Sequence, residues 1–185
     1  MAETKKKRNE SVIHMLVAMV VIFIPVILIT QLFTKDPEPP INPIDWRPVA
    51  AHAAAEASYE VLAPTNLPDG WVATRARFIG VGKPQLGGDP APGDTFQLGF
   101  LSPEQRYFAL DQRDIAPEAF VVAVTRQGRP DGESSVGGQA WARYVSEDGR
   151  TRSLVNQGSD AVSIVSGDLP YEALEAFAAT LEPVA

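Results

Sequence analysis

A run of 24 residues without a charged side chain, Ser11 to Thr34, constrains this chain more than any other feature. An α-helix rises about 1.5 Å per residue and the hydrocarbon core of a bilayer is about 30 Å thick, so about 20 apolar residues span it. The 22 residues from Val12 to Phe33 meet that requirement. Pro25 removes one backbone donor, which a membrane helix tolerates with a kink. The run therefore predicts a transmembrane helix at residues 11–34.

Two other kinds of segment compete with a permanent anchor. A cleaved signal peptide has a core of about 7–15 apolar residues and then a small-x-small cleavage site. Here the core is longer, and residues 31–35 (QLFTK) offer no such site. A buried helix of a soluble protein is rarely apolar on every face over this length. A lipoprotein is excluded because the chain has no cysteine to acylate.

Basic residues are concentrated on one side of the run. Residues 1–10 contain the unbroken series Lys5 to Arg8, whereas Lys35 on the other side is followed at once by Asp36. Lysine and arginine are retained on the cytoplasmic side of a membrane. We therefore expect four parts: a cytoplasmic basic tail (1–10), a transmembrane helix in the lipid bilayer (11–34), a proline-rich linker (35–48) and an extracytoplasmic domain (49–185).

The average composition conceals two parts of opposite charge. The chain carries −7 overall, but residues 1–10 carry +2, and residues 37–185 hold 11 Lys and Arg against 20 Asp and Glu, a net −9. An acidic outer domain argues against nucleic-acid binding, which needs a basic face. The absence of cysteine excludes thiolate sites, and two histidines do not supply a multi-histidine metal centre. We expect no cofactor, no metal and no nucleic-acid partner.

Proline, alanine and glycine mark the start of the outer domain. Residues 36–48 hold five prolines and predict an extended spacer. Trp46 in this spacer suits either a headgroup anchor or the first side chain that packs on the domain, and both readings stay open. The alanine-rich segment 49–57 predicts a short helix. Residues 80–93, with five glycines and three prolines, predict a mobile loop.

The rest of the outer domain alternates strand and turn signals. Residues 117–125 favour a helix because Pro117 suits its first turn. Asp168 is expected to cap a last helix, whose apolar stripe runs from Tyr171 to Leu181. The prediction is an α+β domain of about six mainly antiparallel strands, with two to three helices packed on one side. Period-two alternation and Asp-Gly turns predict strands at 71–79, 95–100, 107–110, 139–146, 150–156 and 160–166.

The sequence contains only weak candidates for a catalytic site. His52 has no marked serine or acid partner for a triad, and Lys83 is the one lysine after Lys35 that a serine–lysine dyad could use. The glycines before Lys83 lack the spacing and the following Ser or Thr of a phosphate-binding loop. Four acids remain, and their positions in turns or beside an arginine favour structural roles over glycoside hydrolysis or calcium binding. They are Asp111, Asp114, Glu147 and Asp148.

No catalytic, cofactor-binding or metal-binding residue is therefore predicted, and the remaining candidates are surface residues that could bind a partner. Trp71, Lys83 and Trp141 are our candidate partner-binding residues, and the loop around Lys83 is expected to order on contact with a partner. Five arginines on predicted strands form a basic strip if their strands are neighbours. Strand arginines opposite acids are the commoner case. These five are Arg75, Arg77, Arg143, Arg150 and Arg152.

Four short motifs carry a family resemblance. They are Leu67-Pro-Asp-Gly-Trp71, Gly138-Gln-Ala-Trp141, Thr151-Arg-Ser-Leu-Val155 and Val162-Ser-Ile-Val-Ser-Gly167, in this order after the basic tail and anchor. With them, nearly the whole chain resembles the actinobacterial single-pass membrane proteins grouped as the domain of unknown function DUF4245. That resemblance implies no activity. The first motif is also similar to the Pro-x-Gly-Trp turn of Mog1/PsbP-type domains, which implies a small α+β module that binds partners.

Three hypotheses about function follow. The first is a non-enzymatic domain on a single-pass anchor that binds an envelope or membrane protein, or another envelope component. The alternative is an enzyme or carrier for a small cell-envelope molecule, with Asp111, Asp114 or Glu147 beside a pocket. A deep apolar pocket that converges on these acids favours the alternative, whereas acids on turns exclude it. The third is an assembly factor whose anchor helix matters as much as its domain.

Overall fold

The computed structural model describes residues 3–33, 42–85 and 87–184, and the chain divides into two compact units, 1–41 and 42–185. The described part of the first unit is helix α1 (Glu3–Phe33), which continues through Pro25. It includes most of the predicted tail because Lys, Arg and Glu are good helix formers. Every side chain from Ile13 to Thr30 is exposed, and the mean hydropathy of this window is 2.8, which suits a membrane span. Residues 35–41 of the predicted linker lie outside the described residues.

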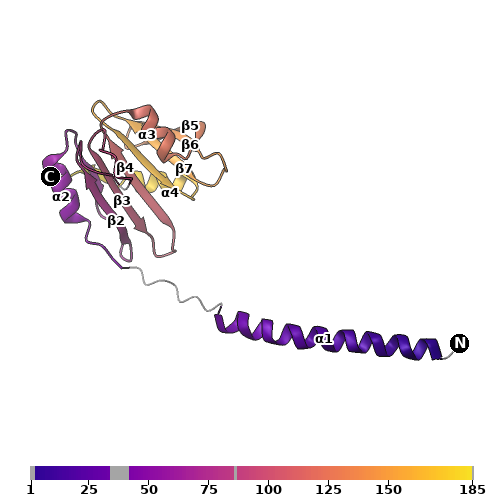
Figure 1. Ribbon diagram of the computed structural model, residues 1–185. Helices are drawn as coiled ribbons and strands as arrows, with labels where there is room; N and C mark the ends of the chain where they lie inside the picture. Colours follow the sequence, from indigo (N-terminus) through magenta and orange to yellow (C-terminus); the bar gives the residue numbers. More distant parts are fainter. Residues whose placement is uncertain (1–2, 34–41, 86, 185) are drawn as a thin grey trace. The chain divides into compact units, whose positions relative to one another are not determined.

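Nine strands form in the described part of the second unit, seven of them in one antiparallel sheet (Figure 1). The order across this sheet is β2-β3-β4-β8-β7-β6-β5, and β1 pairs with β9 in a separate small sheet. The predicted α+β class is confirmed, with more strands than the six expected. The strands are β1 (Leu62–Pro64), β2 (Val72–Ile79), β3 (Thr95–Leu101), β4 (Tyr107–Arg113), β5 (Arg129–Val136), β6 (Gln139–Val145), β7 (Arg152–Gln157), β8 (Val162–Gly167) and β9 (Leu181–Pro183).

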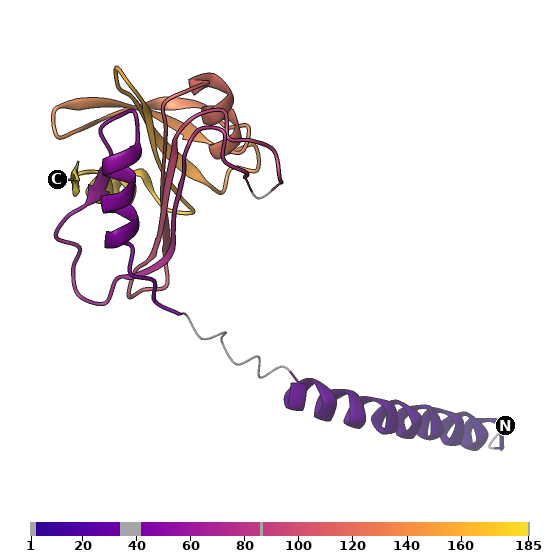
Figure 2. The same cartoon turned by 60° about the vertical axis from the view of Figure 1, so that its left-hand side comes forward.

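Helices cover both faces of the seven-stranded sheet (Figure 2). Helices α2 (Arg47–Glu56) and α4 (Tyr171–Ala178) pack on one face, in a core that includes Val165. Helix α3 (Pro117–Val124) packs on the other face, where its Phe120 joins Ile164. Ile164 and Val165 are successive residues of β8, so their side chains point to opposite faces. The prediction that all helices pack on one side is therefore wrong, because β8 is buried along its whole length and needs cover on both faces.

Two elements differ from the prediction for local reasons. Strand β5 escapes prediction because Arg129-Pro-Asp-Gly132 has the composition of a turn, although proline is tolerated on an edge strand such as this one. Asp168 does not cap α4. Pro170 is the N-cap residue of this helix, and Asp168, two residues earlier, instead accepts a hydrogen bond from Thr151 Oγ1 at 2.6 Å.

The segment before α2 is fixed to the domain. The backbone N–H of Ile44 donates to the carbonyl of Ala73 in β2 at 2.9 Å. The Trp46 ring packs edge-on against Phe100, with 5.7 Å between the ring centroids. Of the two readings of Trp46, the structure therefore supports packing on the domain. The compact unit starts at Asn42, earlier than the predicted boundary at residue 49.

Residues 80–93 form a hydrogen-bonded hairpin in their described part. The N–H of Ala91 donates to the carbonyl of Lys83 at 2.8 Å. At the base of the hairpin, the buried Asp94 carboxylate accepts the N–H of Ser58 at 3.0 Å, which connects this end to the segment after α2. In the described part of the segment predicted as a mobile loop, backbone pairing thus satisfies groups that would otherwise be left to water.

Candidate functional site

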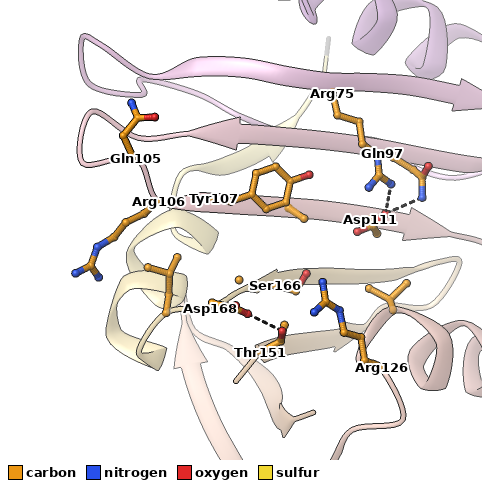
Figure 3. A pocket seen from close by; sticks show the side chains of 14 residues that line it. Arg75, Gln97, Gln105, Arg106, Tyr107, Asp111, Arg126, Thr151, Ser166 and Asp168 are labelled. Carbon is orange, nitrogen blue, oxygen red and sulfur yellow. Dashed lines mark hydrogen bonds and ion pairs between the residues drawn. The ribbon is translucent and has the colours of Figure 1, made fainter. Parts of the chain in front are cut away.

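A polar groove lies on the sheet face that carries α3, next to the end of this helix. Its volume is about 570 Å³, and it opens between strands β2, β3, β4 and β8 (Figure 3). The β3–β4 turn, the end of α3 with the segment that follows it, the residue before β7 and the turn from β8 into α4 complete its lining. Three of its residues are arginines, and we name it the arginine groove. Its labelled polar lining consists of Arg75, Gln97, Gln105, Arg106, Tyr107, Asp111, Arg126, Thr151, Ser166 and Asp168.

Asp111 on β4 is the centre of the groove floor. Its Oδ1 accepts hydrogen bonds from Arg75 Nη2 at 2.8 Å and from Gln97 Nε2 at 2.7 Å (Figure 3). The strand register places Gln97 directly opposite Asp111, and the two-residue period puts Arg75 of β2 on the same face. The Asp111 side chain is 7 % exposed and that of Arg75 is 38 % exposed. The floor is therefore a polar network across three neighbouring strands.

Burial raises the pKa of Asp111 above its ordinary value. The Arg75 guanidinium and the Gln97 amide act in the opposite direction, because both stabilise the charged carboxylate. The effect of burial is the larger one, so the folded chain holds this proton more tightly than the unfolded chain does. Asp111 is thus a buried group with partners on two adjacent strands, which limits its use as a free catalytic base.

Tyr107 covers part of this floor. The residue is 40 % exposed, and its ring lies over Gly99 of β3. A Cβ atom at Gly99 would meet the Tyr107 hydroxyl and approach the Cβ of Arg75 to 3.1 Å. Glycine at this position therefore makes room for the ring above the sheet. The ring gives the groove an apolar surface with a polar tip.

Two arginines stand at the rim of the groove. Arg106 belongs to the β3–β4 turn and Arg126 follows α3, and both are exposed. Within the described part of the chain, neither forms an ion pair. Asp168 on the same rim accepts a hydrogen bond from Thr151 at 2.6 Å and lies 3.8 Å from Arg150. Both aspartates of the groove thus have an arginine partner already, whereas the two rim arginines form no ion pair in the described residues and only influence Glu104 and Asp148 from a distance.

The other predicted acids lie away from the groove. Asp114 accepts a hydrogen bond from Ser58 Oγ at 2.7 Å. Asp148 sits in the β6–β7 turn, where the hydrogen bond from Ser146 Oγ at 2.5 Å lowers its pKa, and the exposed Glu147 precedes it. No group of three or more metal-ligating side chains occurs in the residues that the structure describes. The groove is suited to charge recognition rather than to acid–base chemistry by paired carboxylates.

The three predicted partner-binding residues do not come together. Trp141 is 3 % exposed, since the alternation of β6 points it into the core, and this corrects the prediction that it meets a partner. Trp71 is half-buried and stacks on Phe177, with 5.8 Å between ring centroids. Lys83 is exposed in the 80–93 hairpin, outside the arginine groove.

The strand arginines do not form one basic strip. Arg75 belongs to β2 at one edge of the sheet, whereas Arg143 belongs to β6 in the other half. The alternative, pairing with acids, is confirmed for Arg75 and also for Arg143, whose Nη2 lies 2.7 Å from a Glu175 oxygen. Arg106 and Arg126 escape prediction because both lie in connecting segments that only the tertiary structure brings to one groove.

Comparison with known proteins gives one family and several partly similar solved chains, of which two are described here. No curated protein matches the sequence. One similar chain comes from the complex structure of Pseudomonas aeruginosa MucA/MucB. The two sequences are 17% identical, the matched region covers 69% of this chain and 36% of that chain, and the TM-score is 0.39. The crystal structure of MucB in complex with MucA(peri) has 17% identity, covers 67% and 36%, and gives a TM-score of 0.38. This chain thus spans little more than a third of the length of those chains. The model of the family described as "Protein of unknown function (DUF4245)" matches residues 7–181, so the resemblance in the sequence is confirmed and the chain belongs to this family.

Proposed function

We propose that this protein is a membrane-anchored, non-enzymatic binding module whose arginine groove holds part of a partner protein outside the cytoplasm. The observation that carries the proposal is the groove, a hollow of about 570 Å³ on a sheet face. Its floor is held by hydrogen bonds from β2 and β3 to the Asp111 carboxylate of β4. Side chains fixed on strands keep their geometry better than side chains on loops, which favours selective binding.

The anchor sets the place of binding. The apolar window Ile13–Thr30 suits a single span within residues 11–34, and the basic residues Lys5 to Arg8 favour a cytoplasmic N-terminus. Residues 42–185 then lie on the outer side. A domain on a short anchor stays close to other membrane and envelope proteins, so that even a weak site meets a high effective concentration of partner.

Binding is favoured over catalysis because both carboxylates of the groove, Asp111 and Asp168, already have hydrogen-bond and arginine partners. Asp111 already accepts two hydrogen bonds, and Asp168 accepts one from Thr151. The remaining candidates from the sequence, Asp114 and Glu147, do not line the groove. Acids in turns and at strand ends are typical of solvated or capping groups.

Site-specific photo-crosslinking in the native membrane tests the proposal. Benzoylphenylalanine replaces Tyr107 inside the groove and, as a matched control, Arg129 on the exposed edge strand β5, outside the groove. We expect a discrete crosslinked protein from position 107 and none from position 129. The same products from both positions, or none from position 107, would contradict the assignment of binding to the groove.

The alternative function, an enzyme or carrier for a small envelope molecule, has one observation in its favour. The groove volume of about 570 Å³ falls in the range of about 300–1,000 Å³ that is typical of small-molecule sites. A carrier retains its ligand through gentle purification. Mass spectrometry of small molecules released from the full chain tests this, with the double variant Arg75→Ala/Asp111→Asn for comparison. A compound released by the wild type and absent from the variant would favour the carrier.

A further inference from the structure

We infer that the segment held in the arginine groove is acidic and extended, and that its carboxylates contact Arg106 and Arg126. The inference rests on the proposed function and specifies the chemistry of the partner. It starts from the two exposed guanidinium groups at the rim, which have no ion pair within the described part of the chain. Guanidinium groups in this state bind carboxylates with charge-assisted hydrogen bonds.

The charge of the groove is opposite to that of the domain around it. Residues 37–185 carry 11 basic and 20 acidic side chains, yet the groove lining holds three arginines and only two aspartates. The two aspartates are the ones paired with Arg75 and Arg150. The lining therefore has a small net positive charge, carried by the two rim arginines, in a domain that is acidic overall, and this favours a negatively charged ligand.

The arrangement of the arginines favours a chain with several carboxylates over a single small anion. Figure 3 shows Arg106 and Arg126 on opposite sides of the groove, with Asp168 and Thr151 between them in this view. One phosphate ion has one centre of charge, so it pairs with the arginine on one side of such a site at a time. An extended segment carries successive side chains along its length, so that two of its carboxylates can pair with the two arginines at the same time.

The surface between the arginines also suits a polypeptide. The 40 % exposed Tyr107 and the half-buried Val124 line the groove and offer apolar area. An acidic segment with small or apolar residues between its carboxylates covers this area while it pairs with the rim. Aromatic residues that combine an apolar ring with a polar tip are common in protein interfaces.

An anionic lipid surface is the other source of negative charge near an anchored domain. The net −9 of residues 37–185 opposes the approach of this domain to such a surface, since like charges repel across a distance of about one Debye length, roughly 8 Å at physiological salt. A protein segment can enter the groove without bringing the rest of the acidic domain against a charged plane. The observations therefore favour a protein segment.

The experiment measures binding to the full chain in nanodiscs of phosphatidylcholine, which carry no net charge. The probe is a fluorescein-labelled octapeptide of alternating glutamate and alanine, and its binding is followed by anisotropy. The test variant is Arg106→Glu/Arg126→Glu. The control variant, Arg47→Glu/Arg129→Glu, makes the same change of net charge at two exposed positions outside the groove.

We expect the test variant to weaken binding about tenfold or more, and the control variant to change it less than about twofold. Thermal unfolding followed by circular dichroism checks that both variants fold. Equal losses in the two variants would show nonspecific attraction and overturn the inference, as would unchanged binding in the test variant. Displacement of the probe by inorganic phosphate, or by phosphatidylglycerol vesicles, at the same anion concentration as unlabelled peptide would also overturn it.

Failure of this inference is distinguishable from failure of the proposed function. If crosslinking from position 107 gives a partner but the acidic peptide does not bind, the groove binds a protein of different chemistry. If the peptide binds but position 107 gives no crosslinked protein in the native membrane, the acidic preference stands and the proposed function fails.

Discussion

The substitution Arg75→Ala removes the counter-charge from a carboxylate that the fold has buried almost completely. Asp111 is 7 % exposed and keeps only the Gln97 amide as a hydrogen-bond donor in the variant. Burial raises the pKa of Asp111 already, and Arg75 is the main opposing influence, so the pKa rises further when Arg75 is removed. Protonation of Asp111 stabilises the folded state, because the folded chain binds this proton more tightly than the unfolded chain does. This stabilisation is complete below the unfolded pKa of about 3.9 and is lost as the pH rises through the higher folded pKa.

The expected cost follows from the exposure of the pair. Removal of one partner from a fully buried ion pair costs about 3–5 kcal/mol. Because Arg75 is 38 % exposed and solvent screens the pair, we expect a loss of about 1–2 kcal/mol in the free energy of unfolding at about pH 8. The loss should be smaller at about pH 5 than at about pH 8, because burial raises the pKa of Asp111 and protonation as the pH falls removes the unpaired charge.

Urea titration of the full chain in detergent, followed by tryptophan fluorescence, measures this difference. All three tryptophans lie in the compact unit 42–185, so the signal reports the unfolding of this unit. Arg77→Ala, on the same strand and without an ion pair in the described residues, is the control and should change stability by less than about 0.5 kcal/mol at either pH. In the Asp111→Asn background, Arg75→Ala should lose its pH dependence. The reasoning is refuted by an equal cost at both pH values, or by a pH dependence that persists in that background.

Three further predictions concern glycine packing, the core and topology. Gly167→Ala places a Cβ within 2.6 Å of a backbone carbonyl of β4 and should cost about 1–3 kcal/mol in urea titration, whereas Gly99→Ala, which meets a mobile ring tip, should cost less than about 1 kcal/mol. Trp141→Ala should lower the free energy of unfolding by about 3–5 kcal/mol, because the side chain is 3 % exposed; a small cost would mean that it does not belong to the core. The chain has no cysteine, so single introduced cysteines report topology. In intact cells a membrane-impermeant maleimide should label Ser159→Cys and spare Glu3→Cys, and the reverse pattern would invert the proposed orientation.

Much of the fold could be predicted from local patterns. Phe96, Leu98 and Phe100 alternate with polar or small residues and lie in β3 as expected, and all three are buried. The Asp-Gly turn before Arg150 joins two paired strands, β6 and β7. Strand β5 shows the limit of such patterns, because its stability depends on pairing with β6 rather than on its own turn-like composition.

The candidate site was less accessible to prediction because it depends on strand order. Arg75, Gln97 and Asp111 are each at polar positions of strands, but their meeting requires β2, β3 and β4 to be neighbours in one register. The groove also needs the pairing of β4 with β8, two strands that are distant in the sequence and bring Asp168 to the rim. In the sequence, tryptophans are the more conspicuous candidates for partner binding, yet Trp141 belongs to the core.

The distribution of charge gives a reason why the groove and the acidic domain belong together. At physiological salt, interactions between exposed charges fade beyond about 8 Å. A large charged surface therefore meets the net −9 of residues 37–185, whereas a ligand at the groove meets Arg106 and Arg126 within that distance. An acidic surface around a basic hollow repels anionic ligands that arrive elsewhere and selects those shaped to enter the groove. Removal of these exposed rim arginines should therefore lower the association rate and weaken its dependence on salt, because rim charges act on an approaching ligand over about one Debye length.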